Sequence, residues 1–163
     1  MSSIVGVNAT LQTLRKVQRA LSQERASNAC FDVAQEAADL AQTVYNMADY
    51  DGDRNVTVEA KKHQTGATIT ASGQAVLFME FGAGITHASE QHPFNSEFGF
   101  GPGTYNPDSP NWSNPNGWYF TDPITGQTVR TKGNPPALAM YEAGKTVKER
   151  IEGRIRREVF GND

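Results

Sequence analysis

Apolar residues recur at helical spacing over the first third of the chain. Leu11, Leu14, Val17 and Leu21 are three or four residues apart, with basic residues between them. This spacing predicts an amphipathic helix. An alanine-rich stripe then continues the pattern with Cys30, Val33, Ala34, Ala37, Ala41, Val44 and Ala48. The sequence leaves open whether these residues form one helix or two helices that are broken near Ser27.

The apolar period changes after the turn-forming residues 50–53. Residues 56–61 alternate apolar and polar side chains, and residues 67–71 repeat the alternation after a short polar interval. This arrangement predicts a β-hairpin with one buried face. Ala75–Phe81 follows as either a third strand or a short buried helix, because periodicity does not separate the two in so short a run.

The last two segments differ sharply in composition. Residues 82–133 are rich in Gly, Pro and aromatic residues and poor in charge. A structureless loop of that length is unusual in a compact domain, so we expect it to be functional or ordered by a partner. Asn134, Pro135 and Pro136 predict the start of a final amphipathic helix, because Asn can cap a helix and proline is tolerated in its first turn. Its apolar stripe comprises Tyr141, Val147, Ile151, Ile155 and Val159.

The order of these elements predicts the fold class. An N-terminal helix or helix pair, a small antiparallel sheet, a long Gly/Pro/aromatic loop and a C-terminal amphipathic helix indicate an α+β fold. The length of 163 residues suits a single domain, residues 1–163, with the loop at about 82–133 inserted into it.

Composition narrows the functional classes. The chain has a net charge of −3, so it lacks the excess of basic residues that is typical of a nucleic-acid-binding protein. Cys30 is the single cysteine, so an internal disulfide and two-cysteine metal sites are excluded, and a reducing compartment fits best. There is no signal-peptide pattern and no apolar stretch long enough to span a bilayer, so we expect a soluble protein.

Residues with metal-ligand or catalytic chemistry are few. The acidic turn at 49–53 does not place its ligands in the register of a calcium-binding loop. His87, Glu90 and His92 include metal-ligand types, but their spacing does not match the helical zinc motifs. Loop histidines are the favoured interpretation, with a metal shared between subunits left open. Cys30 lies on an apolar stripe and suits a buried position. We therefore expect no enzymatic activity, no cofactor and no metal within one chain.

The aromatic residues of the long loop have two interpretations. Trp112, Trp118, Tyr119 and Phe120 lie among Asn and Gly residues. Such side chains are enriched at interfaces and stack on sugar rings. They could equally fold the loop back over the sheet. The sequence alone leaves both alternatives open.

Several motifs resemble one family in their order along the chain. Residues 71–84 follow the pattern A-x-G-x-A-V-x-F-x-E-F-G-x-G, and G-x-G-x-G, W-Y and T-K-G-N-P-P follow at 99–103, 118–119 and 131–136. This order resembles the neck, or head-to-tail joining, proteins of long-tailed bacteriophages and prophages, often described as minor tail or tail-completion proteins. Many members carry P-x-D-T-G-x-L before the first strand, whereas residues 47–52 here are M-A-D-Y-D-G. This departure bears on the position within the neck rather than on the fold.

The resemblance implies a non-enzymatic ring subunit at the head–tail junction. Its expected partners are copies of itself and other phage structural proteins, namely a connector or head-completion protein and a tail terminator or tail tube. DNA would only pass through the channel, no membrane is involved, and the location is the virion, assembled in the host bacterial cytoplasm.

The same interpretation assigns roles to residues. Interface residues are expected to be Glu80, Phe81, Phe94, Phe98, Phe100, Tyr105, Trp112, Trp118, Tyr119 and Phe120, and structural ones Gly82, Gly84, Pro135 and Pro136. Two alternatives stand for Glu80. It accepts hydrogen bonds from the backbone or from a basic partner, or it is a buried carboxylate whose hydrogen bonds are satisfied within the monomer. The alternative functions are a carbohydrate- or protein-binding module that uses the aromatic loop and, third, a small metal-dependent hydrolase.

Overall fold

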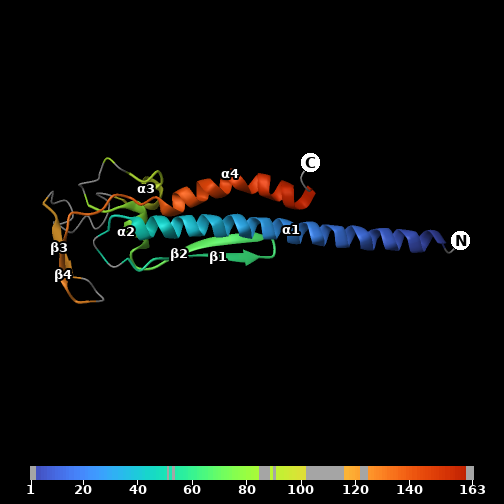
Figure 1. The fold of residues 1–163 in the computed structure, drawn as a ribbon, viewed down its shortest axis with the longest axis horizontal. Helices are drawn as coiled ribbons and strands as arrows, with labels where there is room; N and C mark the ends of the chain where they lie inside the picture. Colours follow the sequence, from blue (N-terminus) through green and yellow to red (C-terminus); the bar gives the residue numbers. More distant parts are fainter. Residues whose placement is uncertain are drawn as a thin grey trace.

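One long helix forms the axis of the molecule, and the other elements lie along it (Figure 1). The computed structural model describes residues 3–50, 52, 54–84, 89, 91–101, 116–121 and 125–160. The elements are α1 (Ser3–Met47), β1 (Thr57–His63), β2 (Gly66–Ser72), α2 (Val76–Phe81), α3 (Asn95–Phe98), β3 (Trp118–Thr121), β4 (Thr128–Thr131) and α4 (Ala139–Phe160). Helix α4 packs against one side of α1 and the β1–β2 hairpin against another. The predicted α+β class is confirmed.

Helix α1 is a single helix of 45 residues. It continues without a break through Ser27 and Asn28, and the side chains of both residues bind the end of the hairpin. The Ser27 hydroxyl donates to the carbonyl of His63 at 2.6 Å, and the Asn28 amide oxygen accepts from Lys62 Nζ. The tip of the hairpin is thereby fastened to the middle of α1.

The predicted hairpin is confirmed. Strands β1 and β2 are antiparallel, with Val58 opposite Ala71 and Ala60 opposite Ile69. These four residues are half-buried and alternate with exposed ones, so the apolar face of the ladder lies against α1. A period of two places successive side chains on opposite faces of a strand, which is why the pattern could be recognised in the sequence.

The segment whose structure was left open, Ala75–Phe81, contains the short helix α2. The following interval is partly ordered within the chain, and the described parts of 82–133 include α3 and a second antiparallel hairpin, β3–β4. Neither α3 nor the second hairpin was predicted from the sequence, which indicated only a long loop here.

The predicted start of the last helix is also wrong. Helix α4 begins at Ala139, after Pro135 and Pro136 rather than on them. Asn134 does not cap it, because its side-chain amide donates to the carbonyls of Phe78 at 2.9 Å and Pro135 at 3.1 Å. The predicted apolar stripe of α4, from Tyr141 to Val159, is half-buried.

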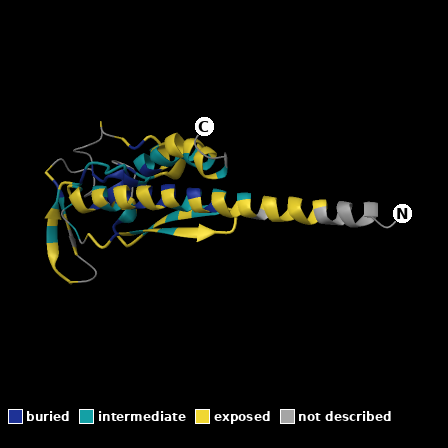
Figure 2. Cartoon of the chain, turned by 45° about the vertical axis from the view of Figure 1, so that its right-hand side comes forward, coloured by how far each residue is buried: buried dark blue, intermediate teal, exposed yellow. Residues whose placement is uncertain are grey.

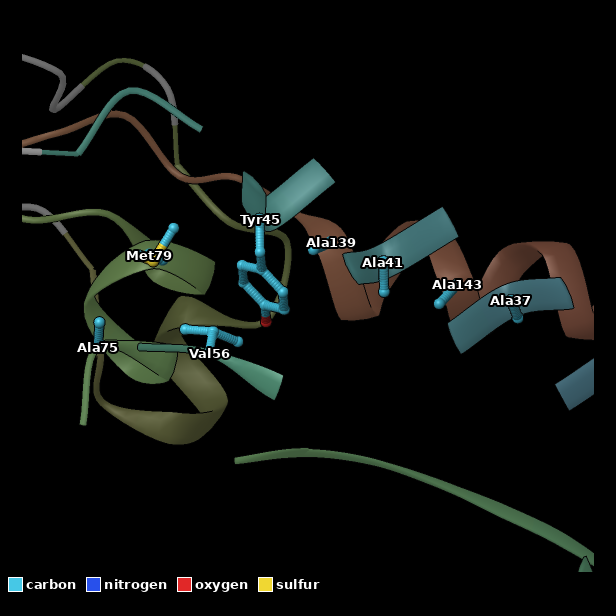
Figure 3. Close-up of a cluster of buried hydrophobic side chains, with 8 residues drawn as sticks. All are labelled: Ala37, Ala41, Tyr45, Val56, Ala75, Met79, Ala139 and Ala143. Atoms are coloured by element: carbon cyan, nitrogen blue, oxygen red, sulfur yellow. The ribbon is translucent and has the colours of Figure 1, made fainter. Parts of the chain in front are cut away.

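The core lies between the C-terminal half of α1, α2 and the start of α4 (Figure 3). Small side chains of α1 and α4 face each other there, and Tyr45 and Met79 fill the wider end. The cluster comprises Ala37, Ala41, Tyr45, Val56, Ala75, Met79, Ala139 and Ala143. Alanines at a helix contact allow close approach of the two backbones, which explains why the C-terminal half of α1 is alanine-rich.

The N-terminal half of α1 projects beyond the other elements (Figure 2). Each residue from Leu11 to Arg19 is exposed, and Leu14 retains 58% of its accessible surface. The apolar stripe predicted for this segment therefore covers nothing in the described part of the chain. Among the described residues, no helix combines the length and the apolar character needed to cross a membrane.

Candidate functional site

The carboxylate of Glu80 is buried where α1, α2 and α4 meet. Only 5% of the residue is exposed, and four hydrogen-bond donors surround it. Its Oε2 accepts from the Tyr45 hydroxyl at 2.8 Å and the Met140 amide at 3.0 Å. Its Oε1 accepts from the Tyr141 amide at 3.0 Å and lies 3.3 Å from Nε2 of His92. The structure thus shows the alternative in which Glu80 is satisfied within the chain, including by backbone donors.

Glu80 also acts as the N-terminal cap of α4. Leu138 stands where the cap residue belongs, because its carbonyl accepts the first helical bond, from Glu142, at 2.9 Å. A leucine side chain has no acceptor for the free amides of the first turn. Glu80 supplies one carboxylate oxygen to each of two such amides, and the helix dipole favours a negative charge at this position. A residue from α2 therefore performs the capping that the sequence predicted for Asn134.

The hydrogen bonds of His92 define its tautomer. The Phe94 amide donates to Nδ1 at 3.0 Å, so Nδ1 is the unprotonated nitrogen of a neutral imidazole. The hydrogen then resides on Nε2 and faces Glu80. His92 is 3% exposed, so the ring is enclosed as well as engaged at both nitrogens.

Tyr45 can be used to test this network, because its environment shifts the pKa of its hydroxyl. Burial raises the pKa of its hydroxyl above the ordinary value, and the nearby Glu80 carboxylate raises the pKa further. The unfolded state releases the proton near the ordinary pKa of 10.0, whereas the folded state retains it. The stability that Tyr45 contributes is therefore present below about pH 10 and falls as the pH rises further.

We expect Tyr45→Phe to lower the free energy of unfolding by about 1–2 kcal/mol at neutral pH, because a hydrogen bond to a charged acceptor is lost. Urea titrations at about pH 8 and about pH 11 should show this difference shrinking at the higher pH. Tyr119→Phe is the control, because Tyr119 is 66% exposed. A Tyr45→Phe difference that is unchanged at the higher pH would contradict the role of the buried hydroxyl.

The motifs that carry the family resemblance meet next to Glu80. Ala83 and Asn134 form an antiparallel bridge, with N···O distances of 3.0 and 3.1 Å. The Ala137 amide also donates to the Met79 carbonyl at 2.7 Å. Gly84 permits close approach here, since a Cβ at this position would lie 2.6 Å from the Lys132 carbonyl oxygen and 3.1 Å from the Trp118 ring. Gly82 ends α2 and is buried, while Pro135 and Pro136 are half-buried in the opposing segment.

His92 belongs to an aromatic cluster, which we define as Phe81, His92, Phe94, Phe98, Phe100 and Tyr141. The ring centroids of Phe81 and His92 are 4.3 Å apart, and Phe94 lies 5.7 Å from Tyr141. Phe98 contacts both Phe81 and Phe94 edge-on. The outer members remain in contact with solvent, because Phe94 is 44% and Phe98 56% exposed. Four expected interface residues, Phe81, Phe94, Phe98 and Phe100, are thus brought together.

The remaining expected residues have separate positions. Trp118 and Tyr119 lie on β3, where Tyr119 is exposed and the Arg130 guanidinium lies 6.0 Å from its ring centroid. Tyr105, Trp112, His87, Glu90 and the side chain of Phe120 lie outside the described residues. Within the part of the chain that the structure describes, no group of three or more His, Cys, Asp or Glu residues is placed to hold a metal ion.

Three residues of the site were missed by the sequence interpretation. Tyr45 was not singled out on α1, Tyr141 was assigned to the apolar stripe of α4, and His92 was interpreted as a loop histidine with a metal role left open. They lie 35, 61 and 12 residues from Glu80 in the sequence. No local spacing connects them. The one available signal was a carboxylate at the end of an apolar run, which required buried donors from elsewhere.

Comparison with protein-family models, with curated proteins and with solved structures finds no match for this chain.

Proposed function

We propose that this protein is a non-enzymatic structural subunit at the head–tail junction of a long-tailed bacteriophage, a neck or tail-completion protein that acts as a ring of identical subunits. The expected neighbours are a connector or head-completion protein and a tail terminator or tail tube. The class comes from the family resemblance of the sequence motifs. The exposed side of the aromatic cluster is the observation that carries an assembly role.

The chemistry of this surface supports a protein partner. Phe94 and Phe98 present large apolar areas to solvent, and aromatic anchors of this kind contribute much of the binding energy in protein interfaces. They rest on Phe81 and His92, which are themselves buried. The rings are therefore held in place before a partner arrives, which lowers the entropy lost on binding. In a closed ring this surface would meet a different patch of the neighbouring subunit.

The buried polar residues support a structural role over a catalytic one. Glu80, His92 and Tyr45 are ionisable groups of the kinds used in catalysis, yet each is enclosed and engaged by neighbours of its own chain. A general acid or base needs to reach a substrate atom within hydrogen-bond distance. In this site the same groups hold α1, α2 and α4 together beneath the aromatic cluster.

The proposal is tested by the double substitution Phe94→Ser/Phe98→Ser in a phage that carries this gene. We expect free heads and free tails to accumulate, with joined particles reduced at least about tenfold, because two apolar anchors are lost. Negative-stain electron microscopy counts the three particle classes. Circular dichroism of the purified variant checks that the fold is retained.

Met47→Ser is the control, since Met47 is an exposed apolar residue on α1 that is neither an expected interface residue nor part of the aromatic cluster. Joined particles at the wild-type level in a folded Phe94→Ser/Phe98→Ser phage would remove the assembly role of the cluster. A gene neighbourhood without portal, capsid and tail-tube genes would argue against the phage assignment itself.

A further inference from the structure

His92 makes one hydrogen bond at each ring nitrogen, and the two bonds need opposite roles. Nε2 donates to Oε1 of Glu80 at 3.3 Å, whereas Nδ1 accepts from the Phe94 amide at 3.0 Å. A neutral imidazole satisfies both contacts, because one nitrogen is a donor and the other an acceptor. An imidazolium is a donor at both nitrogens, so it keeps the contact with Glu80 and cannot accept from Phe94. The Phe94 amide is therefore bound by His92 only while Nδ1 carries no proton.

The segment that depends on this acceptor is short and partly exposed. Helix α3 has four residues, and Phe94 occupies its N-cap position without a capping side chain. The Phe98 amide donates to the Phe94 carbonyl at 3.1 Å, so Phe94 is engaged through both its amide and its carbonyl. So short a helix is not stable by itself, because helix nucleation is unfavourable. We expect this segment, rather than the enclosed ring of His92, to move when the Phe94 amide loses its acceptor.

The titratable groups around the ring act on a proton unequally. Those on the described elements packed around His92 are Glu80 on α2, Tyr45 on α1, Tyr141 and Lys145 on α4, and Glu97 on α3. Of these, Glu80 is bonded to Nε2, and its negative charge attracts an imidazolium. Lys145 contacts the Tyr141 ring and pairs with Glu142, which limits its repulsion. Glu97 is exposed, so solvent screens its charge. A proton on Nδ1 is therefore compensated at Glu80, and the contact that it removes is the one with Phe94.

We propose that His92 is a pH-sensitive switch of the aromatic cluster. With Nδ1 unprotonated, the Phe94 amide is bound and the ring centroids of Phe94 and Tyr141 are 5.7 Å apart, as in the structure. A proton on Nδ1 places two donors 3.0 Å apart, so residues 93–98 move away while His92 stays with Glu80. The cluster is thus closed when His92 is neutral and open when it is charged. Imidazoles change charge between about pH 5 and 8, so mild acid opens the cluster.

The switch regulates the surface to which the proposed function assigns assembly, and this use rests on that function. Opening displaces the Phe94 and Phe98 rings from their supports, so a partner meets anchors that are no longer held in place, which raises the entropy lost on binding. Protonated histidines alter interfaces in this way in other pH sensors. The opening itself is a property of the isolated chain and is measured without phage. A missing pH response therefore leaves the assembly test with Phe94→Ser/Phe98→Ser standing, and a failed assembly test leaves the pH response standing.

The first test is an NMR titration of the purified, isotope-labelled full chain between about pH 8 and about pH 5. We expect Nδ1 of His92 to become protonated and, over the same interval, the protection of the Phe94 amide from hydrogen exchange to fall at least about tenfold, because its acceptor is lost. The amides of Met140 and Tyr141 should stay protected, since they bind Glu80. An Nδ1 that stays unprotonated at about pH 5, an unchanged Phe94 amide, or loss of the two α4 amides at the same pH would overturn the proposal.

The second test uses His92→Asn, which removes the titration and keeps the acceptor. The asparagine side-chain oxygen and Nδ1 of histidine are both bonded to Cγ, so this oxygen can accept from the Phe94 amide throughout the pH range. We expect the protection of the Phe94 amide in this variant to be independent of pH. His63→Asn is the matched control, because His63 is an exposed histidine of β1, and it should keep the wild-type response. A response that persists in His92→Asn or disappears in His63→Asn would overturn the proposal, and the wild-type titration decides it if His92→Asn does not fold.

Discussion

Replacing Glu80 by glutamine should destabilise the protein by about 2–4 kcal/mol, although the two side chains have nearly the same shape. All four groups that contact the carboxylate are donors: the Tyr45 hydroxyl, two α4 amides and Nε2 of His92. The glutamine amide can accept through its oxygen alone, and its nitrogen would face two other donors. Urea unfolding followed by circular dichroism measures the loss.

Glu152→Gln on α4 is the control for this substitution. Glu152 pairs with Arg156 in an exposed position, with 83% of its side chain accessible. Removing its charge should leave the urea midpoint unchanged, because solvent screens such pairs. Since a domain of this kind has a total stability of only about 5–15 kcal/mol, the loss at Glu80 is a large fraction of the whole. Equal midpoints for Glu80→Gln and the wild type would show that the network contributes little.

Replacing Gly133 by alanine should be comparably damaging, by about 2–4 kcal/mol. A Cβ at this position would lie 2.1 Å from the Ala83 carbonyl oxygen, and φ is +91°. The carbonyl is itself fixed by the bridge to Asn134, so the two segments would have to separate. The disruption would reach Glu80 through the adjoining α2.

Gly126→Ala separates the two causes of this loss. Gly126 also has a positive φ, +68°, but a Cβ there would meet nothing within 4 Å. We expect this variant to lose only about 1 kcal/mol, the cost of the left-handed backbone for a residue with a side chain. The same urea titration compares the two variants. Equal losses would mean that the close contact between residues 83 and 133 is unimportant.

Local periodicity was sufficient for the elements that pack along α1. The alanine stripe of α1 and the alternation around Val58 and Ile69 each reflect which side chains face the core, so the pattern and the structure agree. The same rule did not decide α2, because six residues are too few to separate a period of two from a period of 3.6.

Local rules failed at the start of α4 and at Glu80. Asn134 and the two prolines satisfy every local criterion for a helix start, yet the cap comes from a residue more than fifty positions earlier in the chain. The partners of Glu80 lie on other elements, and no sequence spacing predicts which of them will converge. The sequence shows the apolar stripe on the projecting half of α1. Its exposure depends on how far the hairpin and α4 extend along α1, which the local pattern does not contain.

The residue that caps α4 belongs to α2, so the order of translation affects how this site forms. The ribosome delivers Tyr45, Glu80 and His92 well before residues 140 and 141, so a nascent chain that ends within the long loop after His92 holds a carboxylate with two of its four donors still missing. The first turn of α4 likewise finds its acceptors already made when it emerges. Helix α4 is translated after the other members of the network and completes it, so folding of the network is tied to the arrival of α4.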